Sequence, residues 1–322
     1  MATGIVSVAA QLLVMPVVAR ALLVVNAVAY AVLWILTLAR AALHPHAVAR
    51  DFVSHARAPG FFTVVAGTCV LGVQLVVVRP WPAAAAALWV FAAGLYVALI
   101  YTIFFVLIVR REKPALTRAL GGGWLIAIVA TEAVSILGAH VHASFPVAGR
   151  AILFAALCLW LLGGILYVWI MGFIFHRMLF LPMEPADMQP THWVDAGAVA
   201  ISTLAGVTLM ENAALDPLLG RLAPLLEGLT LLFWVTATWW IPMLVLFGLW
   251  RHGLRRVPLR YEVELWSLVF PLGMYTVCSF ELAAAIEMPA LHAIAGVFVY
   301  AALGAWTATF AGLIRTLLGR RA

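Results

Sequence analysis

Glu132 and Glu281 are the residues best placed to do chemistry, because each carries a carboxyl group inside a long apolar stretch. An ionisable side chain in a membrane-length apolar segment is costly and usually faces the protein interior or a watery path. Either carboxyl could therefore carry a proton in a coupled transfer step, or could simply hydrogen-bond to a neighbouring helix. Asp195 begins another apolar stretch, where we expect its carboxylate to cap a helix N-terminus.

The sequence lacks the short motifs that mark most enzymes. It contains no HExxH, no GxSxG and no repeated His/Asp box. The three cysteines, Cys69, Cys158 and Cys278, lie far apart in apolar stretches, so neither a disulfide framework nor a zinc site is expected. We therefore expect a protein that is not an enzyme and that uses no metal and no cofactor.

The composition is typical of an integral membrane protein. Of the 322 residues, 66% are hydrophobic and 10% are charged, whereas soluble domains carry about 25% charged residues. A soluble fold of this size could not hide so much apolar surface, because its own surface has to be wetted. The formal net charge of +6 comes from basic residues in short loops between apolar stretches, a pattern of membrane topology that argues against a nucleic-acid partner.

Ten apolar stretches approach or exceed the length of a membrane-spanning helix, for which roughly 20 residues are needed. Breaks rich in Pro, Gly and charge separate them, and residues 1–322 read as one transmembrane domain. The first stretch is too short to cross comfortably, so we expect the native start to lie upstream and the chain to hold nine full spans and part of a tenth. The predicted spans are about 1–14, 16–39, 60–78, 83–109, 122–141, 149–175, 193–211, 224–250, 265–287 and 290–314.

The spans repeat in pairs. The odd-numbered spans begin at intervals of roughly 60–70 residues, and a fixed period indicates repeated structural units. Here the unit is a helical hairpin, present five times, with a short turn inside each hairpin and a longer basic loop between hairpins. The longer loops and the C-terminal tail, which includes Arg320 and Arg321, hold 15 of the 19 basic residues. Because basic loops stay cytoplasmic, we expect a multi-pass protein of the cell (inner) membrane with both termini in the cytoplasm.

Polar and small residues gather on one face of each odd-numbered span, at about 100° per residue. The even-numbered spans carry more Leu, Val, Phe and Trp, so we expect the odd spans inside, around a narrow pore, and the even spans outside. Faces of small residues also mediate close helix packing without any pore, and that alternative stays open for each stripe. The candidate pore-lining residues are Thr3, Ser7, Gln11, Thr63, Gly67, Gln74, Thr131, Glu132, Ser135, Ser202, Gly206, Ser267, Met274, Cys278 and Glu281.

Several segments resemble one family of membrane transport proteins. The first residues, MATGIVS, resemble the first-helix motif of the tellurite-resistance/C4-dicarboxylate transporter family. That family includes bacterial tellurite-resistance membrane proteins, yeast malate permeases, fungal sulfite exporters and plant guard-cell slow anion channels. Further matches follow in family order along nearly the whole chain: WLIAIVATEAVSILG (124–138), PTHWVDAGAVAISTLAG (190–206), FWVTATWWIP (233–242) and WSLVFPLGMY (266–275).

The resemblance implies an all-α membrane fold of ten helices, arranged as five hairpins in a quasi-fivefold array around a central pore. It also implies a homotrimer in which each protomer has its own pore. Family members carry a pore-blocking Phe just before a kink-forming Pro in the ninth helix, and Phe270-Pro271 matches that position. A proline kinks a helix and an aromatic ring can close a narrow pore, although Phe270 could instead serve plain packing.

Transport of a small anionic solute across the bilayer is the function that the resemblance implies. The solute would be a C4-dicarboxylate such as malate, or a small inorganic anion such as sulfite or tellurite. Glu132 and Glu281 depart from the channel-like members, because a carboxylate would repel an anion. A proton-coupled carrier using Glu132 therefore stays open, as does a membrane scaffold that transports nothing.

Overall fold

The computed structural model describes residues 1–319, apart from the side chain of Arg118. Arg320 and Arg321, counted above with the basic loops, lie outside this range. The described chain is helical, without β-strands: α1 (Ala2–Leu12), α2 (Pro16–Leu43), α3 (Pro45–Phe52), α4 (Phe62–Val77), α5 (Pro82–Val109), α6 (Leu116–Ala119), α7 (Ile126–Val141), α8 (Gly149–Phe180), α9 (Val194–Glu211), α10 (Pro217–Gly248), α11 (Trp266–Ala285) and α12 (Ala290–Leu317).

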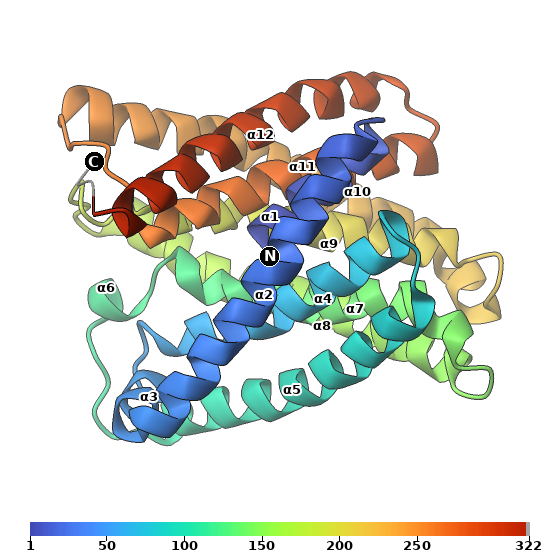
Figure 1. The fold of residues 1–322 in the computed structure, drawn as a ribbon, viewed down its shortest axis with the longest axis horizontal. Helices are drawn as coiled ribbons and strands as arrows, with labels where there is room; N and C mark the ends of the chain where they lie inside the picture. The colour runs from blue at the N-terminus through green and yellow to red at the C-terminus, as the bar shows by residue number, and fades with distance from the viewer. Residues whose placement is uncertain (320–322) are drawn as a thin grey trace.

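Nine helical segments of the described chain are long and apolar enough to cross a membrane. Helix α1 is apolar but shorter, as the first predicted span is. The expected all-α membrane fold is therefore confirmed, with nine candidate spans and one shorter apolar helix in the described residues. In Figure 1, Met1 lies about midway between the ends of the molecule, so α1 extends along only one half of it.

Local sequence explains where many helices begin. Proline is the first residue of α2, α3, α5 and α10, where its fixed φ suits a helix and its missing N–H costs nothing. Asp216 caps α10 by accepting hydrogen bonds from the backbone N–H groups of Leu218 (2.8 Å) and Leu219 (3.2 Å). These signals separate α2, α5 and α10 from the helices that precede them.

The helices pair as consecutive hairpins and then form a closed ring. Within the pairs, α1 packs on α2, α4 on α5, α7 on α8, α9 on α10 and α11 on α12. Among the first members, α1 packs on α4, α4 on α7, α7 on α9, α9 on α11, and α11 again on α1. We call these five the inner helices. The hairpin turns gather at the right of Figure 1, whereas the longer linkers, with α3, α6 and the C-terminus, gather at the left.

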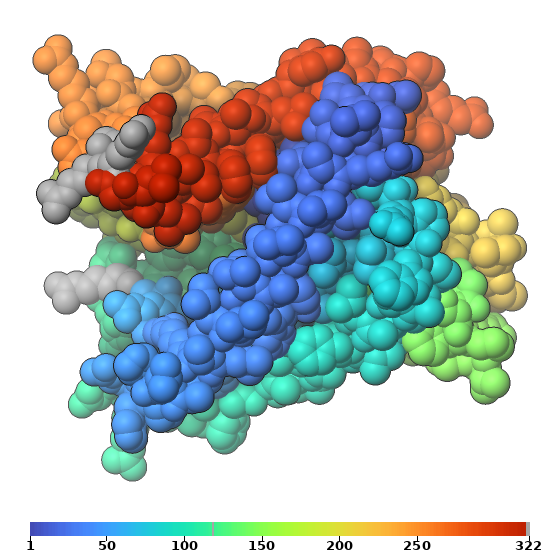
Figure 2. All heavy atoms as spheres, viewed as in Figure 1, coloured from blue at the N-terminus to red at the C-terminus, as the bar shows by residue number. Residues whose placement is uncertain are grey.

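Burial separates the inner helices from the outer ones. The most apolar stretches of α7 and α9 are 83% and 89% buried, against 17–22% for α2, α5, α10 and α12. Figure 2 shows α2 crossing one face of the molecule as part of this outer layer. The outer helices thus present apolar side chains outward, and most side chains of the inner helices are buried.

Each inner helix after the first begins in the same way. A single 3₁₀ turn leads directly into it: η1 (Ala58–Phe61) into α4, η2 (Gly122–Leu125) into α7, η4 (Pro190–Trp193) into α9, and η6 (Val263–Leu265) into α11. The equivalent first helical residues are therefore Phe62, Ile126, Val194 and Trp266. This common start allows positions to be compared around the ring.

Candidate functional site

A narrow apolar cavity of about 20 Å³ lies between the inner helices. That volume is enough for about one water molecule. Every inner helix contributes to its wall, so we call it the central cavity. Its lining residues are Ile5 of α1, Cys69, Val70 and Val73 of α4, Ala133 and Ile136 of α7, Ile201 and Leu204 of α9, and Met274 of α11.

A layer of small side chains lies about one turn from the central cavity, toward the face of the longer linkers. On four inner helices, the residue three positions before a cavity-lining residue is a buried alanine. On α11 the equivalent position, four residues after the helix start, holds Phe270, which is fully buried. The five residues of this layer are Ala2, Ala66, Ala130, Ala198 and Phe270. Four of the five side chains are therefore single methyl groups, and the fifth is a phenyl ring.

Pro271 and Gly197 hold α11 against α9 beside this layer. Pro271 lies inside α11, where it removes one backbone hydrogen bond of the helix. A Cβ at Gly197 would lie 2.7 Å from Cγ of Pro271, closer than real contacts allow. Glycine at 197 therefore permits the close approach of α9 to the segment that carries Phe270.

Several predicted pore-lining residues make hydrogen bonds to outer helices. On α1, Ser7 Oγ donates to the carbonyl of Ala19 in α2 (2.7 Å). Thr3 Oγ1 accepts from Trp306 Nε1 of α12 (3.0 Å). These two hydroxyls join α1 to its neighbours, and neither residue lines the central cavity.

Two polar residues of α7 that were predicted to line the pore also make hydrogen bonds to outer helices. Ser135 Oγ donates to the carbonyl of Ala156 in α8 (2.7 Å). Thr131 Oγ1 donates to the Ala127 carbonyl within its own helix (2.8 Å) and lies 2.9 Å from the Tyr96 hydroxyl of α5. Helix packing, the alternative left open for each stripe, accounts for these contacts.

Gln74 and Gly206 also face neighbouring helices. Asn26 Nδ2 of α2 donates to Gln74 Oε1 (2.6 Å), and both side chains are buried. At Gly206 an added Cβ would collide with Thr230 of α10 and would lie 3.1 Å from the Trp160 ring of α8. The small residue is needed there for packing between an inner helix and two outer ones.

The remaining predicted residues divide by position. Of the whole set, Met274 is the one that lines the central cavity. Cys278, one turn beyond it on α11, is buried. Toward the helix ends, Thr63 is exposed and bonds to the Gly60 carbonyl. Partly exposed positions are Gln11, Gly67, Ser267 and Glu281.

Glu132 lies between three helices. Its carboxyl group is fully buried, and Ser202 Oγ of α9 donates to Oε1 (2.9 Å). The other oxygen, Oε2, has no hydrogen-bond partner among the described residues. A Cβ at Gly163 of α8 would collide with the carboxyl group. Glu132 thus occupies a tight junction of α7, α8 and α9 and is separate from the lining of the central cavity.

Asp195 does not have the capping role expected from the sequence. It lies in the first turn of α9, where a negative charge suits the helix dipole, but its Oδ2 pairs with His192 Nδ1 (3.1 Å). His192 is almost fully buried. A histidine three residues before an aspartate at a helix start was the signal that could have revealed this pair.

Two arginines fix the linker that precedes α9. Arg177, at the end of α8 and nearly buried, donates from Nη2 to Asp187 Oδ1 (2.8 Å) and from Nη1 to the Leu120 carbonyl. Arg251 donates to the Met188 carbonyl. These two basic side chains therefore hold the linker in place, in addition to any effect of their charge on membrane orientation.

A larger cavity of about 390 Å³ lies away from the ring axis, between the α7–α8 and α9–α10 turns. His142, Arg150 and Asp216 are among its lining residues. Arg150 Nε donates to Asp216 Oδ2 (3.1 Å). Burial favours a higher pKa for Asp216, but the N–H groups of Leu219 and Leu218 and the Arg150 guanidinium outweigh it and lower the pKa. Only turn residues and the adjoining helix ends line this cavity, so it is separate from the central cavity.

The ring of buried helices and the outer apolar layer define a multi-pass membrane protein. A family model described as a voltage-dependent anion channel (SLAC1) matches residues 1–314, and the chain belongs to this family. The resemblance to the tellurite-resistance/C4-dicarboxylate transporters is thereby confirmed. Membership supports anion transport in general.

Relatives agree with this assignment. An uncharacterized membrane protein of Mycobacterium tuberculosis is 41% identical over 152 residues, which cover 47% of this chain and 77% of that protein. Two uncharacterized transporters of Methanocaldococcus jannaschii are more distant. One is 23% identical over 215 residues, covering 66% of this chain and 60% of that protein. The other is 25% identical over 120 residues, covering 37% and 33%.

Proposed function

We propose that this protein moves small anions through the axis of the inner ring and that Phe270 closes the path. The observation that carries the proposal is the layer of four alanines and one phenylalanine next to the central cavity. In that layer the ring of Phe270 is the only large side chain. Its removal would connect the cavity with the face of the longer linkers.

The lining of the path favours selection by size and hydration. The central cavity is entirely apolar and carries no lysine or arginine. A narrow apolar constriction excludes water and gates by dewetting. Substrates would be C4-dicarboxylates such as malate, or small inorganic anions such as sulfite or tellurite.

Flux into proteoliposomes tests the proposal. Wild type and Phe270→Ala would be compared for malate, sulfite, nitrate and chloride. We expect the alanine variant to pass at least one of these anions faster than wild type, by roughly tenfold or more, because a dewetted plug is removed. Phe233→Ala is the matched control, since Phe233 packs edge-on against Trp160 between two outer helices. The absence of anion flux in both wild type and Phe270→Ala would refute the proposal.

A proton-coupled carrier that uses Glu132 is the second candidate. The observation that favours it is the buried, unpartnered Oε2 of Glu132 in the described structure. This version predicts that Glu132→Gln abolishes the pH dependence of anion uptake, because the amide cannot exchange a proton. Uptake by wild type and variant would be compared from pH 5 to pH 8. Superimposable pH profiles would remove Glu132 from the mechanism.

We also propose that the protein is a homotrimer in the cell (inner) membrane, with both termini in the cytoplasm. The basic linkers support this orientation, because they gather at one end of the molecule in Figure 1. Exposed apolar side chains on the outer helices provide surface for lipid and for neighbouring protomers. Light scattering of the purified protein tests the trimer, and labelling of single cysteines placed in the linkers tests the orientation.

A further inference from the structure

The cavity-facing sides of three inner helices continue toward the hairpin turns with titratable residues. On α11, Glu281 follows Met274 by seven residues, about two helical turns, and so lies on the same side. On α7, His140 follows Ile136 by four residues, and on α9 Glu211 follows Leu204 by seven. All three lie near the ends of helices that terminate at the hairpin turns.

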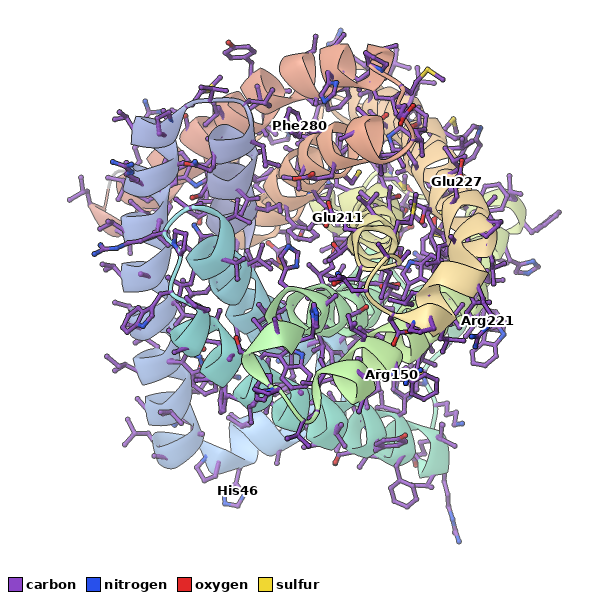
Figure 3. All side chains as sticks on the ribbon, turned by 90° about the vertical axis from the view of Figure 1, so that its right-hand side faces the viewer. His46, Arg150, Glu211, Arg221, Glu227 and Phe280 are labelled. Atoms are coloured by element: carbon purple, nitrogen blue, oxygen red, sulfur yellow. The ribbon has the colours of Figure 1, made fainter. Side chains whose placement is uncertain are left out.

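Figure 3 looks onto this face of the molecule. Glu211 lies near the middle of the view, where the inner helices end, whereas Arg221 and Glu227 lie toward the outer edge. We call the region of His140, Glu211 and Glu281 the turn-side mouth. It lies on the opposite side of the central cavity from Phe270.

The two carboxylates lie on helices that pack against each other, Glu211 on α9 and Glu281 on α11. His140 lies on α7, which also packs on α9. Within the described chain, neither carboxylate has an ion-pair partner. His140 donates from Nδ1 to the Ile136 carbonyl (2.8 Å), and so carries its proton there.

Neighbouring elements bring no bonded cation to this mouth in the part of the chain that the structure describes. From α12, His292 packs on the ring of Phe280 beside Glu281. At the start of α10, Asp216 is already paired with Arg150. The α11–α12 turn adds the exposed Glu287, and α1 offers the uncharged Gln11. Within the described chain, Glu211 and Glu281 are therefore acidic groups without a bonded cation.

We propose that Glu281 and Glu211 make anion passage asymmetric in its two directions, by repelling anions that approach the turn-side mouth. The inference rests on the proposed function, because it concerns the same axial path. Charges at a pore mouth change the local concentration of a permeating ion. The opposite face carries the basic linkers, so anions enter more readily there. With the proposed membrane orientation, the protein favours anion export from the cytoplasm.

Currents across a planar bilayer test this inference in the open Phe270→Ala background. Symmetrical chloride with a large organic cation ensures that chloride carries the current. We expect currents at opposite voltages of equal size to differ by roughly threefold or more. Acidifying the chamber that faces the turn-side mouth to about pH 4 should remove the asymmetry, because carboxylates near this pH lose their charge. Acidifying the chamber on the side of the basic linkers should leave the asymmetry in place. High salt should weaken it.

Three added substitutions separate charge from structure. Glu281→Gln with Glu211→Gln should abolish both the asymmetry and its response to acid, whereas Glu281→Asp should keep them. Glu227→Gln, at the outer edge of the same face, should have no effect. A conducting Phe270→Ala protein whose asymmetry survives the double Gln change would overturn the inference and leave the proposed function intact. A Phe270→Ala protein that carries no anion current would instead refute the proposed function, and this inference with it.

Discussion

At the residue scale, polar side chains of the inner helices have two different uses. Ser7 and Ser135 donate to carbonyl groups of outer helices and so hold the hairpins together. Glu281 and His140 lie instead on cavity-facing sides near the hairpin turns. A helical stripe in the sequence identifies a face of a helix, but it does not say whether that face meets a neighbour or the axis.

Asp216 provides a prediction about acid stability. Its pKa is lowered in the folded state, so its contribution to stability is full above the ordinary carboxyl pKa of about 3.9. That contribution is lost as the pH falls through the lowered value. Wild type should therefore lose more thermal stability between pH 6 and pH 3 than Asp216→Asn, which can still cap α10 but carries no charge.

Melting temperatures measured against pH check this prediction. Glu227→Gln is the control, since Glu227 is an exposed carboxylate further along α10. It should follow the wild-type curve. Parallel curves for wild type and Asp216→Asn would show that the Arg150 pair and the helix cap do not make the charge of Asp216 stabilising.

At the element scale, close approach of helices depends on a few glycines. Gly163 of α8 faces the Glu132 carboxyl, and Gly197 of α9 faces Pro271. The prolines and charged breaks in the sequence predict where the helices begin, and the spacing of the spans predicts the hairpins. The sequence does not predict the glycine contacts, because these depend on how two helices far apart in sequence are rotated against each other.

Gly163→Ala should destabilise the protein. The added methyl group would collide with the Glu132 carboxyl, and overpacking of this kind costs about 1–3 kcal/mol. Gly172→Ala on the same helix is the matched control, since nothing lies within 4 Å of a Cβ there. It should be neutral or slightly stabilising, because alanine favours a helix. Equal melting temperatures for the two variants would show that the junction of α7, α8 and α9 can relax.

At the scale of the whole molecule, composition and spacing predicted an all-helical membrane protein with buried odd-numbered helices. The pore-lining set was less predictable. Cavity-lining residues such as Ile5, Val73 and Leu204 are apolar, so a search for polar stripes passed over them. The layer of alanines and Phe270 emerges when α4, α7, α9 and α11 are aligned from their 3₁₀ starts and α1 is placed by its cavity-lining Ile5. Phe270 itself was found through its place before Pro271.

The most direct test of a closed axial path is the size dependence of conduction at position 270. Anion flux through reconstituted wild type, Phe270→Leu and Phe270→Ala should rise in that order, as the side chain in the alanine layer shrinks. Phe233→Ala, which removes a ring between outer helices, should stay at the wild-type level. Flux that does not change across the series, or that rises equally in Phe233→Ala, would contradict a gate at Phe270.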